Sequence, residues 1–179
     1  MLKKLVLCSD THELHRSLSW PEGDILVHAG DFTMNGRPEK IEEFGKWLHY
    51  SPFSAIIIIA GNHDILFQKK PEKAKKLLSK HDKIHYPEDS GCRVDGISFY
   101  GAAWQPESGY GWASTLDTEQ ESRKKWQSIP PGVQVLITHG TAGWNTGFYG
   151  RWKACRQYVT TGRDQSKNKA ATTSLWPHT

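Results

Sequence analysis

The sequence lacks a hydrophobic run long enough to cross a membrane, although it has 179 residues. Its longest aliphatic run is Ile56–Ile59, whereas a membrane-spanning helix needs about 20 apolar residues. The apolar start of the chain ends at Ser9 and Asp10, too early for a signal peptide. Only three cysteines are present and none forms a Cys-x-x-Cys pair, which disfavours a disulfide framework and a structural zinc cage. The sequence therefore predicts a cytoplasmic protein with no membrane contact.

Most of the chain lacks a net charge, because its positive and negative residues are nearly equal in number. Residues 1–140 contain 17 Lys and Arg against 18 Asp and Glu, whereas residues 141–179 contain six Lys and Arg against Asp164 alone. Nucleic-acid binding would depend on this basic end only, and the sequence disfavours it. The same end is poor in aliphatic residues, so it buries too little apolar surface to offset the entropy of ordering. We therefore divide the chain into a domain over residues 1–140 and a divergent basic tail over 141–179, expected to be poorly ordered.

Strand-like and helix-like segments alternate along the domain. Buried strands are predicted at residues 5–8, 24–29, 55–60 and 133–138. Helices are expected at 38–50, 71–81 and 115–129, and a hairpin at 92–100. Apolar strands separated by helices indicate a layered α/β fold.

Side chains that bind metal ions follow all four predicted strands. They are Asp10 and His12 after the first strand, Asp31 after the second, Asn62, His63 and Asp64 after the third, and His139 after the fourth. Ligands bind beyond the carboxyl ends of strands in open α/β sheets. One histidine at a strand end is more often structural, but recurrence at four strand ends favours a metal centre. Its mixture of oxygen and nitrogen donors suits Mn²⁺, Fe or Zn²⁺ better than Ca²⁺.

The motifs that carry these side chains resemble those of the calcineurin-like metallophosphoesterases, and most closely those of the small metallophosphoesterase-domain proteins. They are Asp10-x-His12, Gly30-Asp31, Gly61-Asn62-His63-Asp64 and Thr138-His139-Gly140. The resemblance covers residues 1–140. It implies a four-layer αββα metallophosphoesterase sandwich that is C-terminally incomplete.

The resemblance also implies a reaction, the two-metal hydrolysis of a small phosphoester, most simply a phosphodiester. It assigns Asp10 and His12 to one divalent ion (Mn²⁺, Fe or Zn²⁺) and Asn62 and His139 to the other. Asp31 would bind both ions, because a carboxylate has lone pairs for two cations.

Two further roles follow from the third motif. The resemblance implies that His63 donates a proton to the leaving oxygen and that Asp64 orients the His63 imidazole through a hydrogen bond. Outside the motifs, contact with substrate and exposure to solvent are equally favoured for His15. His28 is expected to lie in the core or beside the metal ligands.

The last motif of the family is missing from this sequence. Gly-His-x-His does not follow Gly140, and His178 is the only later histidine. A tryptophan codon read one base later becomes a glycine codon, and the three tail tryptophans stand where a family-like sequence has glycine: Trp144, Trp152 and Trp176. A frameshift near Gly140 is thus one hypothesis for the tail, and a divergent selected tail is the other. The chain is then either an active metallophosphoesterase or a catalytically impaired, truncated or frameshifted member with at most weak metal binding.

Overall fold

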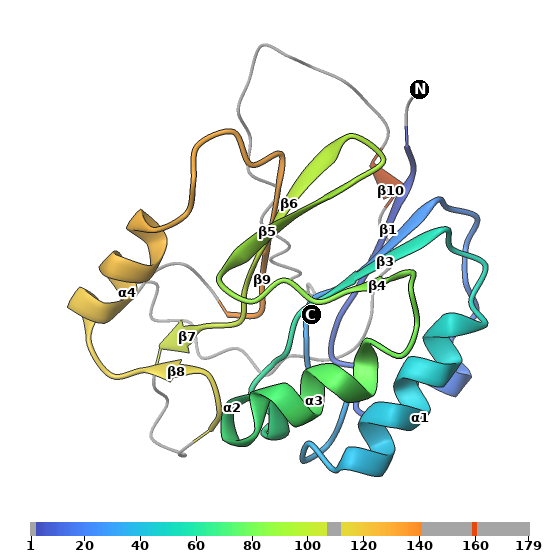
Figure 1. The fold of residues 1–179 in the computed structure, drawn as a ribbon, viewed down its shortest axis with the longest axis horizontal. Helices are drawn as coiled ribbons and strands as arrows, with labels where there is room; N and C mark the ends of the chain where they lie inside the picture. The colour runs from blue at the N-terminus through green and yellow to red at the C-terminus, as the bar shows by residue number, and fades with distance from the viewer. Residues whose placement is uncertain (1–2, 107–111, 141–158, 161–179) are drawn as a thin grey trace, which may run out of the picture.

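The computed structural model describes residues 3–106 and 112–140 and the short strand Val159–Thr160 (Figure 1). The strands are β1 Leu5–Cys8, β2 Ile25–His28, β3 Ala55–Ile58, β4 Ile84–His85, β5 Ser90–Val94, β6 Ile97–Ala102, β7 Gln105–Pro106, β8 Thr115–Leu116, β9 Val135–Thr138 and β10 Val159–Thr160. The helices are α1 Pro38–His49, α2 Leu66–Lys69, α3 Pro71–Leu78 and α4 Glu119–Gln127, with a 3₁₀ turn at His15–Ser17. Apart from β10, the predictions made for residues 141–179 lie outside the described residues.

The strands form two main sheets. The first has the order β10-β1-β2-β3-β4, in which β1 to β4 are parallel and β10 is antiparallel to β1. The sequence of the tail shows no strand pattern, yet Val159 pairs with Val6 at this edge. The second sheet has the order β5-β6-β9, with β6 antiparallel to β5 and parallel to β9. The pair β7–β8 is separate.

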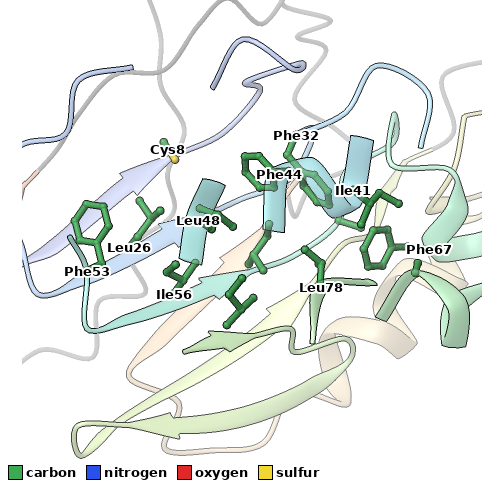
Figure 2. Packing of buried hydrophobic residues seen from close by; sticks show 14 of the residues in the cluster. Cys8, Leu26, Phe32, Ile41, Phe44, Leu48, Phe53, Ile56, Phe67 and Leu78 are labelled. Atoms are coloured by element: carbon green, nitrogen blue, oxygen red, sulfur yellow. The ribbon is translucent and has the colours of Figure 1, made fainter. Parts of the chain in front are cut away.

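One face of the first sheet packs against helices. Successive side chains of a strand point to opposite faces, so Leu26 and Ile56 both face the layer formed by α1 and α3. There they join one buried cluster with Phe44 and Leu48 of α1 and Leu78 of α3 (Figure 2). Burying these side chains stabilises the layer by about 1.5–3 kcal/mol each.

The other face of the first sheet packs against the second sheet. Ile25 and Ile57, next in sequence to the helix-facing residues, belong to a second buried cluster with Phe99 of β6 and Ile137 of β9. The successive layers are therefore helices, sheet and sheet, and the α/β fold expected from the sequence is confirmed. Helix α4 contacts β8 of the separate pair β7–β8. No helix among those residues is long and apolar enough to cross a membrane.

Helix α4 begins later than the sequence pattern predicted. Thr115 and Leu116, expected in the first helical turn, instead pair with Gln105 and Pro106 as β8. The helix starts after Thr118, whose hydroxyl accepts a hydrogen bond from the backbone N–H of Glu121 in a capping box. The expected start at residue 115 is wrong because this cap ends the extended segment.

Candidate metal centre

The proposed ligands come together at the carboxyl ends of the strands. Asp10 and His12 follow β1, Asp31 follows β2, and Asn62 and His63 follow β3. Because these strands are parallel, their carboxyl ends lie on the same side of the first sheet. His139 follows β9 in the second sheet, yet its ring lies next to Asn62 at these strand ends. These six side chains all line one cavity of about 230 Å³.

The backbone beside the ligands is held in a conformation that L residues rarely adopt. Asp10, His12 and Asp31 have φ values of 55°, 41° and 57°, in the left-handed region. Backbone hydrogen bonds from Asp10 N to Gly30 O and from His12 N to Asp31 O, both 2.9 Å, join the loops after β1 and β2. Such strain costs of the order of 1–3 kcal/mol per residue and clusters at functional sites.

The carboxylate of Asp31 is the centre of the arrangement. Its Oδ2 lies 3.8 Å from His12 Nε2 and 4.0 Å from His63 Nε2, and its Oδ1 lies 3.5 Å from His139 Nε2. The structure brings two groups of metal-binding atoms together, each with atoms within 4.8 Å of one another: His12, Asp31 and His63, and Asp10, Asp31 and His139. Asp31 is the member common to both groups.

Asp10 and His63 lie near ligands beyond those that the resemblance paired with them. The sequence placed Asp10 with His12 around one ion; in the structure Asp10 Oδ1 lies 4.0 Å from His12 Nε2, and Asp10 also belongs to the group of Asp31 and His139. The structure also places His63, expected to act only on the phosphate, within reach of Asp31 and His12. Asp31 is shared by the two groups of ligands in the sequence prediction and in the structure alike.

The ring of His139 shows that the site fits a cation. Its Nδ1 is 2.8 Å from the carbonyl oxygen of Ala29, which can only accept, so Nδ1 carries the proton. The other ring nitrogen, Nε2, points at Asn62 Oδ1 at 3.0 Å and at Asp31 Oδ1 at 3.5 Å. A ring nitrogen, an amide oxygen and a carboxylate oxygen that converge in this way are groups that can bind a divalent ion between them.

Two glycines let the backbone approach this centre. A Cβ atom added at Gly61 would collide with Asp31 Oδ1 and lie 2.7 Å from the ring of His139. At Gly30, where φ is 100°, a Cβ atom would lie 2.7 Å from His139 Nδ1. The space beside Asp31 and His139 therefore exists only because these positions have no side chain.

The imidazole of His63 is oriented by a contact that the sequence did not predict. Its Nδ1 is 2.8 Å from the carbonyl oxygen of Met34, so Nδ1 donates and Nε2 faces Asp31. The expected hydrogen bond from Asp64 to the His63 ring is wrong. The backbone N–H of His63 instead donates to Asp31 Oδ1 at 2.8 Å.

Asp64 joins the loops of the site through their backbones. Its buried carboxylate accepts hydrogen bonds from Gly61 N, Asp31 N and Thr33 N, all 2.9 Å, and from the Thr33 hydroxyl at 2.7 Å. Burial, with a contribution from the charge of Asp31, raises the pKa of Asp64 to about 7, while the hydrogen bonds from Gly61 and Thr33 oppose the rise. The side chain thus holds Asp31 in place without contacting an imidazole.

Two other side chains have surroundings that sequence reasoning missed. Trp112 lines the cavity and its ring lies 4.4 Å from that of His63, yet it belongs to no motif, so no sequence signal identifies it. His15 neither faces solvent nor lines the cavity, because it is buried against Phe44 and Trp47.

His28 supports the site from the helical side of the sheet. Its Nδ1 accepts from Gly30 N at 3.3 Å, so Nε2 carries the proton and donates to the Thr11 hydroxyl at 3.1 Å. Complete burial lowers the pKa of His28 from 6.5 to about 3. The expectation that His28 lies in the core beside the ligands is consistent with these contacts.

The depressed pKa of His28 predicts acid sensitivity. Folded His28 stays neutral while the unfolded chain takes up a proton, so stability is fully present above pH 6.5 and is lost as the pH falls toward 3. We expect about 1.4 kcal/mol of unfolding free energy to be lost per pH unit in this range. Urea denaturation of wild type at a series of pH values measures the slope. His28→Gln should reduce it and the exposed-site control His49→Gln should not; an unchanged slope in His28→Gln would contradict the prediction.

The comparisons with known proteins agree with this chemistry. The family model described as calcineurin-like phosphoesterase matches residues 3–164. Human metallophosphoesterase domain-containing protein 1 is 37% identical over 157 residues, an alignment that covers 76% of this chain and 48% of the human protein. A UPF0046 protein of Caenorhabditis elegans is 33% identical over 147 residues, with 76% of this chain and 50% of that protein covered.

A solved crystal structure has the same fold. Its TM-score is 0.60 at 12% sequence identity, and the alignment covers 77% of this chain and 69% of that one. The chain spans about half the length of the curated relatives that it matches.

Proposed function

The chain belongs to the calcineurin-like phosphoesterase family, and from this premise we propose that it hydrolyses small phosphodiesters with two divalent ions. The observation that carries the proposal is the buried carboxylate of Asp31, which is shared by two groups of metal-binding side chains. The donors, two carboxylates, an amide and imidazoles, suit Mn²⁺, Fe or Zn²⁺. The cytoplasmic location remains a prediction from the sequence.

The residues that would hold the ions are those predicted from the sequence. Asp10 and His12 would bind one ion, Asn62 and His139 the other, and Asp31 both. When bound, a pair of divalent ions supplies Lewis acidity and positive charge for phosphoryl transfer.

Hydrogen bonds to backbone carbonyl oxygens orient the two imidazoles of His139 and His63 for this reaction. Ala29 O fixes the His139 ring so that Nε2 faces Asp31 and Asn62, and a bond of this kind raises the basicity of a ligating histidine. His63, held through Nδ1 by Met34 O, presents Nε2 to the cavity and would give a proton to the leaving oxygen. No covalent enzyme intermediate is needed.

His63→Ala tests this division of labour. We expect the variant to retain bound metal but to lose about 10²–10⁴-fold in turnover, the effect typical of a general acid. Hydrolysis of methyl phenyl phosphate with Mn²⁺, followed by release of phenol, measures turnover, because phenolate is basic enough to need a proton as it leaves. Elemental analysis of the desalted protein measures metal. His49→Ala, which removes an exposed imidazole from the end of α1, is the matched control and should match wild type.

The opposite pattern would overturn the role. Because His63 Nε2 is only 4.0 Å from Asp31 Oδ2, a loss of metal without a separate effect on turnover would make His63 a ligand instead of a proton donor.

A catalytically impaired family member is the second candidate. The observation that favours it is the absence of Gly-His-x-His after Gly140, which in the resemblance completes both metal shells. A chain that binds Mn²⁺ weakly and does not hydrolyse the phosphodiester, beside a version read one base later after codon 140 that does, would establish this candidate.

A further inference from the structure

His63 lies between two other rings. His12 meets it edge to face with ring centroids 4.7 Å apart, and Trp112 lies on another side at 4.4 Å with an interplanar angle of 33°. Nδ1 of His63 is engaged by Met34 O, so only the Nε2 side of the ring is directed toward the cavity. Of these neighbours, His12 and Trp112 also line the cavity.

The place of His63 locates the leaving group. In the proposed hydrolysis a water oxygen forms a bond to phosphorus and the bond from phosphorus to the leaving oxygen breaks. The leaving oxygen takes the proton of His63 Nε2, a proton released by the water restores the imidazolium, and the products are a phosphomonoester and an alcohol or phenol. The leaving group must therefore lie next to His63 Nε2, in the cavity that His63 and Trp112 both line.

The cavity next to His63 has surroundings of two kinds. Toward Asp31 lie carboxylates and imidazoles, which are suited to ions and phosphate oxygens. The indole of Trp112 is the large aromatic surface of the described cavity lining. A planar aromatic ring packs well on an indole, in stacked or edge-to-face geometry, whereas a compact alkyl group gains much less.

We infer that Trp112 determines specificity, forming an aromatic wall for the leaving group, and that the preferred substrates are phosphodiesters with a planar aromatic leaving group. This inference rests on the proposed hydrolysis and names the substrate class for the same site. Stacking of a base on an aromatic side chain contributes about 1–3 kcal/mol, which corresponds to about 5- to 150-fold in kcat/KM.

The experiment compares two substrates that differ in the leaving group. Methyl p-nitrophenyl phosphate has a planar leaving group, and methyl trifluoroethyl phosphate has an activated leaving group that is not planar. Wild type, Trp112→Leu and Trp112→Phe are assayed with Mn²⁺, the first substrate by absorbance and the second by fluorine NMR. Each variant is compared with wild type on the same substrate, so the intrinsic reactivity of the two esters cancels.

An aromatic wall at Trp112 predicts a loss of kcat/KM that is confined to the aryl ester. Trp112→Leu should lower kcat/KM for the aryl ester about 10-fold or more and change the trifluoroethyl ester less than about 2-fold, whereas Trp112→Phe should retain most of the aryl activity. Trp126→Leu is the matched control, because Trp126 lies in α4, where its indole donates to Ser122, and it does not line the cavity. An equal loss on both esters, or a larger loss on the trifluoroethyl ester, would make Trp112 a positioning residue for His63, and no loss on either would show no role; each of these outcomes overturns the inference.

Absence of turnover by wild type on both esters would count against the proposed function and not against the wall. In that case calorimetry on the Mn²⁺-treated protein compares methyl phenyl phosphate with methyl ethyl phosphate. Tighter binding of the phenyl ester that Trp112→Leu abolishes supports the aromatic wall, and equal binding of the two esters overturns it.

Discussion

Asp31→Asn is expected to abolish hydrolysis and metal retention together. The neutral amide removes the negative charge that both groups of ligands share, and disturbing even outer contacts of a metal site usually costs about 10–100-fold in affinity or activity. Loss of the shared ligand should cost more than that. The measurement is the rate with Mn²⁺ on methyl p-nitrophenyl phosphate, with metal content determined on the same preparation.

The variant should still fold, because an asparagine Oδ1 can accept the hydrogen bond that His63 N donates to Asp31 Oδ1. Asp24→Asn is the matched control: its carboxylate also accepts a backbone hydrogen bond, from Lys4 N at 2.7 Å, far from the cavity. Full activity and metal content in Asp31→Asn would show that the binuclear account is wrong.

Gly61→Ala should have nearly as large an effect although it changes no ligand. The added methyl group would occupy the space of Asp31 Oδ1 and press on the ring of His139, two ligands whose positions the proposed site requires. We expect activity and metal affinity to fall by about 100-fold, the upper end of the range for disturbing the contacts that support metal ligands. Steady-state kinetics over a range of Mn²⁺ concentrations measures both quantities.

Gly45→Ala separates this effect from a general intolerance of alanine. Gly45 lies inside α1, where an added Cβ atom would meet its nearest neighbours at 3.6 Å, an ordinary contact. Alanine in a helix interior is favoured over glycine by about 0.5–1 kcal/mol, so Gly45→Ala should be fully active and slightly more stable. Wild-type activity in Gly61→Ala would show that Asp31 and His139 do not need their observed positions.

The sequence was sufficient to predict the central part of the fold. The apolar strands before Asp10, Asp31 and Asn62 are continuous and end in polar residues, so their parallel pairing places these side chains at one edge. His139 was predicted at the same place, but its strand pairs with β6 in the second sheet. A local pattern of apolar residues does not specify which sheet a strand joins.

Contacts through the backbone were beyond the reach of the sequence. The residue type of Asp64 suggested a partner for an imidazole, yet its carboxylate binds the backbone N–H groups of Gly61, Asp31 and Thr33. Backbone donors have no sequence signature, so such a role becomes visible only with coordinates. Trp112 was missed for a related reason, because its proximity to His63 depends on long-range packing.

The number of divalent ions bound per chain tests the central claim most directly. Wild type and Asp31→Asn are stripped with a chelator, treated with Mn²⁺, desalted and analysed for metal and for phosphodiester hydrolysis in the same samples. The account predicts two ions per wild-type chain, with hydrolysis restored as they bind, and loss of both ions and hydrolysis in Asp31→Asn. Equal metal content in the two proteins, or hydrolysis by stripped wild type, would contradict it.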